Sequence, residues 1–398
     1  MNITIQPGKL SGIIRIIPSK SQAHRLLICS AFADKETTLN CPETNQDIEA
    51  TVDCLNSLGA QICRTEFGYH VTPVSKIPQQ AVLNCCESGS TLRFMLPIVG
   101  ALGVDATFRM AGRLPQRPLS PLWEEMERMG CTLSRPTSDS IRCTGRLTPG
   151  HYRINGGISS QFITGLLFAM ALMEGNSKLE IIGTLESKPY VNMTQLALST
   201  FHVDTTDFRV TGSFPFCSPR NIDVEGDWSN GAFFLTAKAL GSTLNIDGLD
   251  STSAQGDRAV AEILTLLWTK QTISAADIPD LIPILSVAAA ANNGCTFTNI
   301  ERLRLKESDR VASVIAMLNA LGILAEATQS TLTIHPGQIH GGIVDAVNDH
   351  RIAMSAAIAA TVADGPVTIL GAQCVSKSYP AFWDEYGRLG GNYEQYIR

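Results

Sequence analysis

Strongly apolar runs of helical length recur along the chain, each preceded by a few small or polar residues. One capping-type residue marks the start of each run, and the markers are Ser21, Ser90, Ser160, Ser229, Asp280 and Asp349. The intervals between successive markers are 69, 70, 69, 51 and 69 residues. A sustained period of this size indicates repeated supersecondary units. The one short interval predicts a deletion of about 18 residues within the fourth unit, between Asp257 and Asp280.

Each repeat also contains a second, amphipathic segment that often closes on a glycine. The clearest examples are residues 49–62, 122–131, 308–323 and 382–391. A glycine there can adopt the left-handed C′ conformation that ends a helix. Short β-rich runs such as 330–336 and 366–370 fall between the helices. The pattern predicts a β-α-β-α-β-β unit with three units in each domain. In the shortened unit, we expect the second helix to run directly into the next unit.

Composition is typical of a folded protein with more than one domain. The chain has 398 residues, which favours about two to three domains, and charged residues make up only 17%. The net charge is −6, with no run of Lys or Arg, which argues against nucleic acid or an acidic membrane surface as a partner. The most apolar stretches, 165–173 and 282–291, are too short to span a bilayer.

The beginning of the sequence and the cysteines favour the cytoplasm. The first ten residues contain no apolar segment of the kind found in a signal peptide. The 11 cysteines are scattered without a C-x-x-C motif, so neither a disulfide framework nor a zinc site is predicted. A reducing compartment fits that usage.

Cationic side chains gather at the starts of the repeated helices. The amino-terminal end of a helix carries unpaired N–H groups and a partial positive charge, so several such ends together would form an anion site. Lys306 and Arg310 are four residues apart and are expected to share one face of a helix. The cations near helix starts are Lys20, Arg25, Arg117, Lys306, Arg310, Arg351 and Lys377. They predict recognition of phosphate and carboxylate groups in a cleft between two domains.

Each of these features also has a structural explanation. Ser, Thr and Asp are common N-caps, and a single Lys or Arg usually lies at the surface. Asp280 follows a proline and could cap a helix, and Glu307 could form an ion pair with Lys306 or Arg310. The residues alone favour these explanations for Asp280 and Glu307.

Ten short motifs in order give the chain a resemblance to a known family. They are PSKSQAHR (18–25), SGSTLRF (88–94), RPLSPL (117–122), GGISSQF (156–162), SKPY (187–190), VEGDWS (224–229), IPD (278–280), LKESDR (305–310), NDHR (348–351) and SKSYP (376–380). In these motifs the chain resembles the 3-phosphoshikimate 1-carboxyvinyltransferase (5-enolpyruvylshikimate-3-phosphate synthase) family of enolpyruvyl transferases, essentially from end to end. Glu87 and Arg302 depart from the common pattern, which has Asn at both positions, so neither is given a binding role.

The resemblance implies an α/β fold of two inside-out α/β barrels, each with three of the repeated units. One domain would comprise residues 1–18 plus 225–398, and the other residues 19–224. It also implies transfer of the enolpyruvyl group of phosphoenolpyruvate to the 5-hydroxyl of shikimate 3-phosphate, in the pathway to chorismate and the aromatic amino acids. Inorganic phosphate would be released, glyphosate would inhibit, and neither a metal nor a cofactor would be needed. The protein would be a cytoplasmic monomer.

The resemblance also implies residue roles. The second domain would bind shikimate 3-phosphate, whereas Asp280, Lys306, Glu307, Arg310, Arg351 and Lys377 belong to the first. Residues implied for shikimate 3-phosphate are Lys20, Ser21, Arg25, Ser159, Ser160, Gln161, Ser187, Tyr190, Asp280 and Lys306. Residues implied for phosphoenolpyruvate are Lys20, Gly89, Ser90, Arg117, Gln161, Arg310, Arg351 and Lys377. The implied catalytic residues are Asp280 at the acceptor hydroxyl, Glu307 at the donor methylene, and Lys20 between the substrates.

Two alternatives remain at this point. The sister enolpyruvyl transferase that acts on UDP-N-acetylglucosamine has a reactive Cys in the loop before its donor-binding Arg. The corresponding loop here, residues 111–120, contains no Cys. A non-catalytic sugar-phosphate binding protein would not need Asp280 and Glu307 together with the donor cations.

Overall fold

The computed structural model describes residues 1–212 and 214–396, whose packing divides into two compact units. The split unit combines Met1–Ile17 with the chain from Glu225 onward, and the continuous unit is Pro18–Val224. The chain therefore crosses twice between them. The sequence prediction placed the first crossing one residue later, after residue 18.

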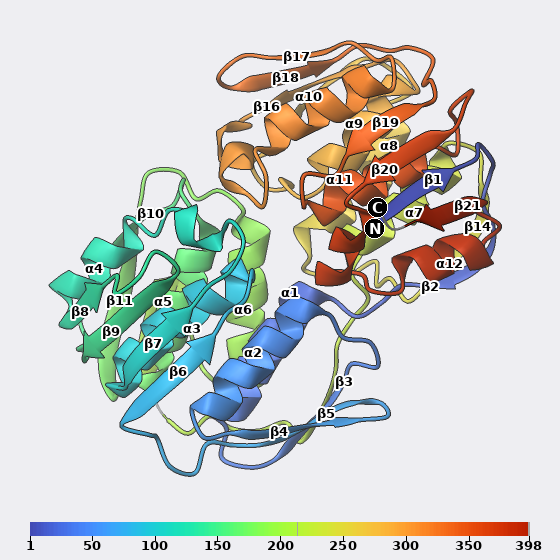
Figure 1. Ribbon diagram of the computed structural model, residues 1–398. Helices are drawn as coiled ribbons and strands as arrows, with labels where there is room; N and C mark the ends of the chain where they lie inside the picture. Colours follow the sequence, from blue (N-terminus) through green and yellow to red (C-terminus); the bar gives the residue numbers. More distant parts are fainter. Residues whose placement is uncertain (213, 397–398) are drawn as a thin grey trace. The chain divides into compact units, whose positions relative to one another are not determined.

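The continuous unit carries helices α1–α6 and strands β3–β13 (Figure 1). Its helices are α1 (Lys20–Ala31), α2 (Gln46–Ser57), α3 (Gly89–Leu102), α4 (Leu122–Arg128), α5 (Ser160–Leu172) and α6 (Lys188–Thr200), with 3-10 turns η1 (Leu114–Gln116) and η2 (Thr206–Phe208). Its strands are β3 (Thr37–Asn40), β4 (Gln61–Thr65), β5 (Gly68–Thr72), β6 (Gln80–Asn84), β7 (Asp105–Arg109), β8 (Cys131–Ser134), β9 (Ser140–Gly145), β10 (His151–Asn155), β11 (Gly175–Ile182), β12 (Arg209–Gly212) and β13 (Asn221–Asp223).

The split unit carries the remaining elements. Its helices are α7 (Trp228–Ala239), α8 (Val260–Leu266), α9 (Ile282–Ala290), α10 (Arg310–Ala320), α11 (His350–Ala359) and α12 (Phe382–Arg388), with 3-10 turns η3 (Gly256–Ala259), η4 (Glu301–Leu305) and η5 (Ala372–Lys377). Its strands are β1 (Asn2–Ile5), β2 (Ser11–Arg15), β14 (Thr243–Asp247), β15 (Gln271–Ser274), β16 (Cys295–Thr298), β17 (Ala325–Ala327), β18 (Thr331–Ile334), β19 (Gly342–Asp345), β20 (Val367–Leu370) and β21 (Tyr393–Tyr396).

The repeated unit predicted from the sequence is confirmed in four sheets, whereas in the described part of the third unit the sheet β10-β11-β12 has three strands. In β6-α3-β7-α4-β8-β9 the strand order is β6-β7-β9-β8, with β6 and β7 parallel and β9 antiparallel to both its neighbours. The same order recurs in β15-β16-β18-β17 and β13-β3-β5-β4. The last sheet, β19-β20-β1-β21, takes its third strand from the start of the chain. Within each unit, a strand next to the first crossing pairs with a strand next to the second. In the continuous unit β3 pairs with β13, and in the split unit β2 pairs with β14.

The apolar helices form the core of each unit, as their composition predicts. Every residue of α9 is buried, and α5 exposes little beyond part of Gln161 at its first turn. Strands such as β8 alternate buried and exposed positions, so each such sheet faces the helices on one side and solvent on the other. Buried helices surrounded by sheets are the inside-out arrangement that was expected. Among the described residues, no helix is both long enough and apolar enough for a membrane span.

The shortened fourth unit lacks a hairpin. Helix α8 ends at Leu266 and β15 begins at Gln271, and residues 267–270, all of them described, contain no strand. In the first unit the hairpin β4-β5 occupies the corresponding place. The prediction that the second helix leads directly into the next unit is confirmed, and the sheet of this unit is the pair β14-β2.

Several helices begin earlier than the sequence markers. The N-caps of α1, α3, α5 and α7 are Ser19, Ser88, Ser159 and Asp227, not Ser21, Ser90, Ser160 and Ser229. Each true cap accepts a backbone N–H two or three residues ahead. Two capping-type residues lie close together at each start, so residue type alone could not choose between them. Asp349 caps α11 as expected, whereas Asp280 caps no helix.

Glycines end the amphipathic helices as predicted. Gly59, Gly130, Gly322 and Gly390 follow the C-caps of α2, α4, α10 and α12, and all have positive φ. At Gly59 a Cβ atom would also lie 2.7 Å from the carbonyl oxygen of Lys76, so a larger residue has no room.

Candidate active site

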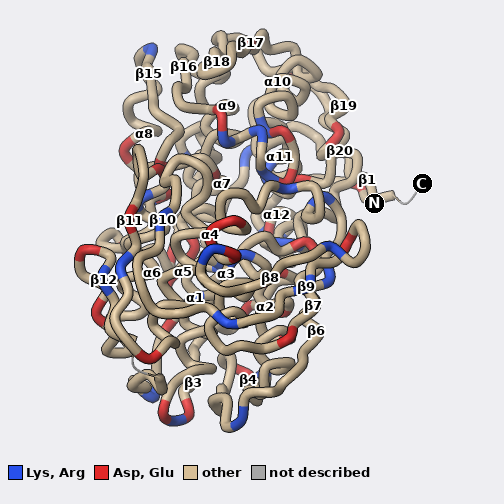
Figure 2. Tube along the Cα trace, turned by 90° about the vertical axis from the view of Figure 1, so that its left-hand side faces the viewer, with Lys and Arg blue, Asp and Glu red and all other residues tan. Residues whose placement is uncertain are grey.

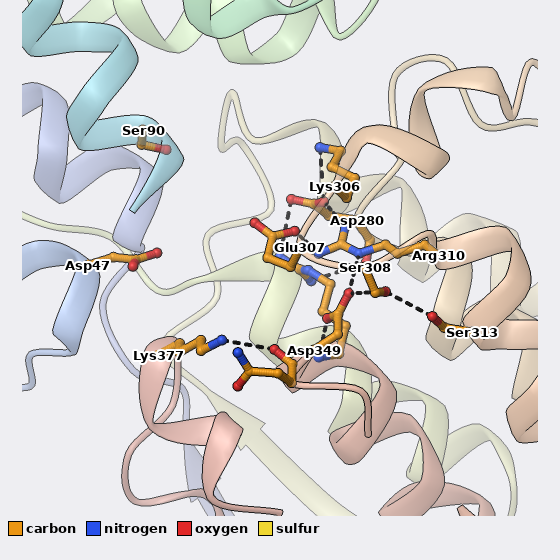
Figure 3. A network of polar contacts seen from close by, with 12 residues as sticks. Asp47, Ser90, Asp280, Lys306, Glu307, Ser308, Arg310, Ser313, Asp349 and Lys377 are labelled. Atoms are coloured by element: carbon orange, nitrogen blue, oxygen red, sulfur yellow. Dashed lines mark hydrogen bonds and ion pairs between the residues drawn. The ribbon is translucent and has the colours of Figure 1, made fainter. Parts of the chain in front are cut away.

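A buried cluster of charged side chains lies at the starts of α9, α10 and α11 in the split unit (Figure 3). The Asp280 carboxylate accepts a hydrogen bond from Arg310 Nη1 at 2.6 Å and another from Arg351 Nη2 at 3.2 Å. Lys306 Nζ lies 3.4 Å from the same carboxylate. Glu307 Oε2 is 2.7 Å from Arg310 Nη2. Asp280 and Arg351, which are 71 positions apart in the sequence, are therefore in direct contact.

Helix capping holds this cluster together. Asp349 Oδ1 accepts the backbone N–H of Arg351, which caps α11. Its other oxygen, Oδ2, accepts hydrogen bonds from Ser308 Oγ at 2.9 Å and Arg310 Nε at 3.0 Å. One carboxylate therefore joins the start of α11 to the start of α10. Arg310 is only 1% exposed and donates to three different carboxylates, which fixes the plane of its guanidinium group.

The cluster brings similar amounts of positive and negative charge together. Burial alone would raise the pKa of the Asp280 carboxyl, but Arg351, Lys306 and Arg310 outweigh it and hold that pKa well below its usual value. Burial lowers the pKa of Lys306 to about 8, against the opposing effect of Asp280. The pKa of Asp257, which is buried nearby and feels the Asp280 charge, is raised to about 6. Asp280 is therefore ionised at neutral pH, and the pKa of Lys306 lies closer to neutral pH than that of Arg310.

Two expectations for this region need correction. Lys306 and Arg310 do not share a helix face, because Asp309 caps α10 and the helix begins only at Arg310, while Lys306 follows η4. They meet instead at the Asp280 carboxylate. Asp280 is not an N-cap, since α9 follows Leu281 without a side-chain cap. The predicted ion pair between Glu307 and Arg310 does form.

Lys377 extends the split-unit site to α7. Its Nζ donates to the carbonyl oxygen of Asn348 at 2.9 Å, immediately before the start of α11. The next residue, Ser378, hydrogen-bonds Asn230 in the first turn of α7 at 3.2 Å. The starts of α7, α10 and α11 and the segment before α9 are thus connected within one unit.

The continuous unit gathers helix starts in the same way. Lys20 Nζ lies 2.9 Å from the Asp47 carboxylate, which links α1 to α2. Gln161 Nε2 donates to Ser90 Oγ at 2.9 Å, which links α5 to α3. The Thr91 hydroxyl lies 3.4 Å from the Asp47 carbonyl oxygen and completes the set. Lys20, Ser90 and Gln161, all predicted for the site, are therefore connected at one end of this unit.

Two guanidinium groups lie directly against the backbone of Gly89. A Cβ atom at this position would be 2.6 Å from Arg117 Nη1 and 2.8 Å from Arg93 Nη1. Gly89 is the first residue of α3, so its N–H belongs to the first turn, where N–H groups have no carbonyl partner within the helix. The close approach of two cations to a helix start gives this point local positive charge, which suits an anion.

Arg25 is turned into the core instead of outward. It is 2% exposed and donates to Thr194 Oγ1, the Ser21 carbonyl oxygen and the Tyr190 carbonyl oxygen. Its guanidinium also lies over the Phe94 ring at 5.2 Å. In this geometry Arg25 ties α1 to α6, and its predicted contact with a ligand stays a prediction.

The remaining predicted residues lie at helix starts. Ser159 caps α5, Ser160 is its first residue, and Ser187 precedes α6 with a left-handed φ of 53°. Left-handed backbone is costly for a residue with a Cβ atom, and such positions often occur at functional sites. Tyr190 lies in the first turn of α6, and Ser21 follows Lys20 in α1.

Three residues of these clusters received no site role in the sequence analysis. Asp47 pairs with Lys20, Asp349 anchors Arg310, and Arg93 contacts Gln161. Arg93 lies inside the SGSTLRF motif but received no role, and Asp349 was regarded only as a cap. Acidic and basic positions are interspersed along the whole trace in Figure 2, so charge alone does not single these residues out.

Comparison with known proteins places the chain in a family. A family described as EPSP synthase (3-phosphoshikimate 1-carboxyvinyltransferase) matches residues 5–386. The 3-phosphoshikimate 1-carboxyvinyltransferase of Clostridium kluyveri is 36% identical, over 99% of this chain and 98% of its own length. That of Clostridium botulinum (strain Eklund 17B) is 38% identical, over 98% of both.

Solved structures agree with the fold. An EPSP synthase from Acinetobacter baumannii superposes with a TM-score of 0.80 at 23% identity, covering 99% of both chains. The enolpyruvyl transferase NikO from Streptomyces tendae gives a TM-score of 0.74 at 18% identity, over 99% of this chain and 98% of its own. At these identities the likeness concerns the fold, and it confirms the predicted two-domain α/β architecture.

Proposed function

The chain belongs to the EPSP synthase family, and from this membership we propose that it transfers the enolpyruvyl group of phosphoenolpyruvate to the 5-hydroxyl of shikimate 3-phosphate. The reaction forms a bond between the acceptor oxygen and the central carbon of the donor and releases inorganic phosphate. It serves the synthesis of chorismate and the aromatic amino acids.

One observation carries the proposal beyond family membership. Lys306, Arg310 and Arg351 surround Asp280, with Glu307 beside them. Neutralising about four or five substrate charges is the main electrostatic demand of this reaction. We assign Arg310, Arg351 and Lys377, with Arg117, Gln161 and the backbone of Gly89 and Ser90, to phosphoenolpyruvate. We assign Ser21, Arg25, Ser159, Ser160, Gln161, Ser187, Tyr190 and Lys306 to shikimate 3-phosphate, and Lys20 to both.

The pKa directions refine the catalytic assignments. Asp280 keeps its charge at neutral pH because its pKa is held well below the usual value. It therefore acts mainly by accepting a hydrogen bond from the 5-hydroxyl of shikimate 3-phosphate and so orienting that group. Lys306, with a pKa of about 8, is better matched to proton exchange near neutral pH. Glu307 lies at the edge of the cluster and is assigned to proton transfer at the donor methylene.

We also propose a cytoplasmic monomer. The 11 cysteines are all free, and eight of them are buried, which fits a reducing compartment. The monomeric state follows from the family resemblance, and analytical ultracentrifugation would check it.

The test is phosphate release by the purified protein with both substrates present. We expect turnover only when phosphoenolpyruvate and shikimate 3-phosphate are supplied together. Omitting either substrate, or replacing the acceptor by UDP-N-acetylglucosamine, should abolish release. Turnover with phosphoenolpyruvate and the nucleotide sugar as the sole acceptor would assign the chain to the sister activity. Phosphate binding without any turnover would favour the non-catalytic alternative.

A further inference from the structure

We propose that Arg93 is a positioning residue that turns the Gln161 amide and the Ser90 hydroxyl into hydrogen-bond donors for an anion at the start of α3. Arg93 lies in α3 and is 3% exposed. The inference rests on the proposed function only in naming that anion, which would be a phosphate or carboxylate group of phosphoenolpyruvate.

The chemistry of Arg93 fixes the orientation of the amide. Arg93 Nη1 donates to Gln161 Oε1 at 2.8 Å. A guanidinium group has donors and no acceptor, so the amide atom that faces it must be the oxygen. The Gln161 nitrogen must then point away from Arg93, and it donates to Ser90 Oγ at 2.9 Å. A second N–H remains on the same nitrogen and is available to a ligand.

The orientation of the Gln161 amide also determines which way the Ser90 hydroxyl donates. Its oxygen accepts a hydrogen bond from Gln161, so its own O–H is left to donate elsewhere. Ser90 is the second residue of α3, beside the N–H groups of the first turn. Arg93, Gln161 and Ser90 thus form a chain with a single direction, and each bond polarises the next toward an anion.

Arg93 is itself held in place. Its Nη2 donates to the carbonyl oxygen of Pro118 at 3.2 Å, and its guanidinium lies 5.6 Å from the centre of the Phe162 ring. Pro118 follows Arg117 and Phe162 follows Gln161, so one buried cation braces both segments. Without it, the amide could present its oxygen to the anion, and the hydroxyl could rotate away.

A double-mutant cycle tests this inference. Arg93→Met removes the donor while keeping an apolar stem, and Gln161→Met removes the amide. We expect Arg93→Met to raise the KM for phosphoenolpyruvate about 5–30-fold, the loss expected for a charge-assisted hydrogen bond that is no longer oriented, with a smaller change in kcat. In the Gln161→Met background the same change should alter this KM by less than about 2-fold. Equal effects in both backgrounds would show that Arg93 acts through its own charge, and would overturn the proposal.

Two further variants separate positioning from folding. Arg93→Lys keeps the charge and N–H donors but not the planar fork, so its KM for phosphoenolpyruvate should lie between those of the original protein and Arg93→Met. It also carries the comparison should Arg93→Met unfold. The matched control is Arg64→Met, because Arg64 likewise donates to backbone carbonyls and lies over a ring, that of Tyr69, yet lies outside the site. Arg64→Met should leave the KM unchanged, and an equal rise there would contradict a specific role for Arg93.

Calorimetric titration with inorganic phosphate distinguishes this inference from the proposed function. Weaker phosphate binding in Arg93→Met, seen only when Gln161 is present, would support the positioning role even if the protein lacked the proposed turnover. Unchanged phosphate binding together with an unchanged KM would overturn it, whatever the reaction.

Discussion

Replacing Asp280 by Asn should unbalance the charged cluster of the split unit. Its carboxylate meets Arg310 at 2.6 Å, Arg351 at 3.2 Å and Lys306 at 3.4 Å, and its side chain is 18% exposed. Asn can still accept from Arg310 through its oxygen, but its NH₂ group would then face Arg351, donor against donor. Removing one partner of a buried ion pair costs about 3–5 kcal/mol.

That loss should be visible in thermal unfolding. For a unit of this size it corresponds to a fall in Tm of about 6–20 °C. Because the folded-state pKa of Asp280 lies below its usual value, its stabilisation is present above pH 4 or so and is lost as pH falls through the folded pKa. The difference between Asp280→Asn and the original protein should therefore be full at pH 7 and shrink only in strong acid.

Activity provides the second measurement. We expect kcat to fall by about 10²-fold, as for loss of a group that orients a reactant. The KM for phosphoenolpyruvate should also rise, because Arg310 and Arg351 lose a shared anchor, while affinity for shikimate 3-phosphate changes little. The control is Asp105→Asn, which breaks an exposed pair with Arg142. A fall in Tm no larger than in that control would show that the ion pairs of Asp280 do not stabilise the split unit.

Three further predictions follow from single contacts. The Lys306 ammonium should lose its proton as pH rises through about 8, so the KM for shikimate 3-phosphate should rise there in the original protein and stay flat in Lys306→Arg; a persistent rise would implicate another group. Gly89→Ala places a Cβ atom 2.6 Å from Arg117 Nη1 and should lower kcat/KM about 10–100-fold with Tm unchanged, and a fall in Tm instead would show a folding defect. Burial and then nearby Cys54 raise the pKa of Cys86, so mass spectrometry should show slow alkylation by iodoacetamide at pH 7, while Cys86→Ser keeps full turnover; rapid labelling at pH 7 would contradict the shift.

The periodic features of this fold could be predicted from the sequence, since they depend on local patterns. The spacing of apolar helices identified the repeats, and the interval that was about 18 residues short corresponds to the missing hairpin after α8. Helix starts were misplaced by one or two residues because neighbouring Ser or Asp residues compete as caps. The strand pairing between β1 and β20 links residues more than 360 positions apart, which no local pattern records.

Candidate site residues were predictable as members of motifs, but as partners only where they lie close together in the sequence, as Glu307 and Arg310 do. Arg310 and Asp280 are 30 residues apart, and only tertiary packing shows that they share a hydrogen bond. Arg25 shows a related limit, because the sequence places this cation near a helix start but does not show that it donates to the backbone carbonyls of Ser21 and Tyr190. The direction of an arginine side chain depends on the acceptors that surround it, and the sequence does not place them.

The pairing of β1 between β20 and β21 has a consequence for biosynthesis. Ile3 lies in register with both Ile369 and Gln395, so this strand has no lateral partners until nearly the whole chain has been made. At about 5–20 residues per second, translation leaves the first strand waiting on the order of 20–80 s, long after residues 18–224 have left the ribosome. A strand with one apolar face and unpaired edges, exposed for that time, can pair with another nascent chain. Ribosome-associated chaperones that shield this amino-terminal segment should therefore increase the yield of native protein more than chaperones that act on the finished continuous unit.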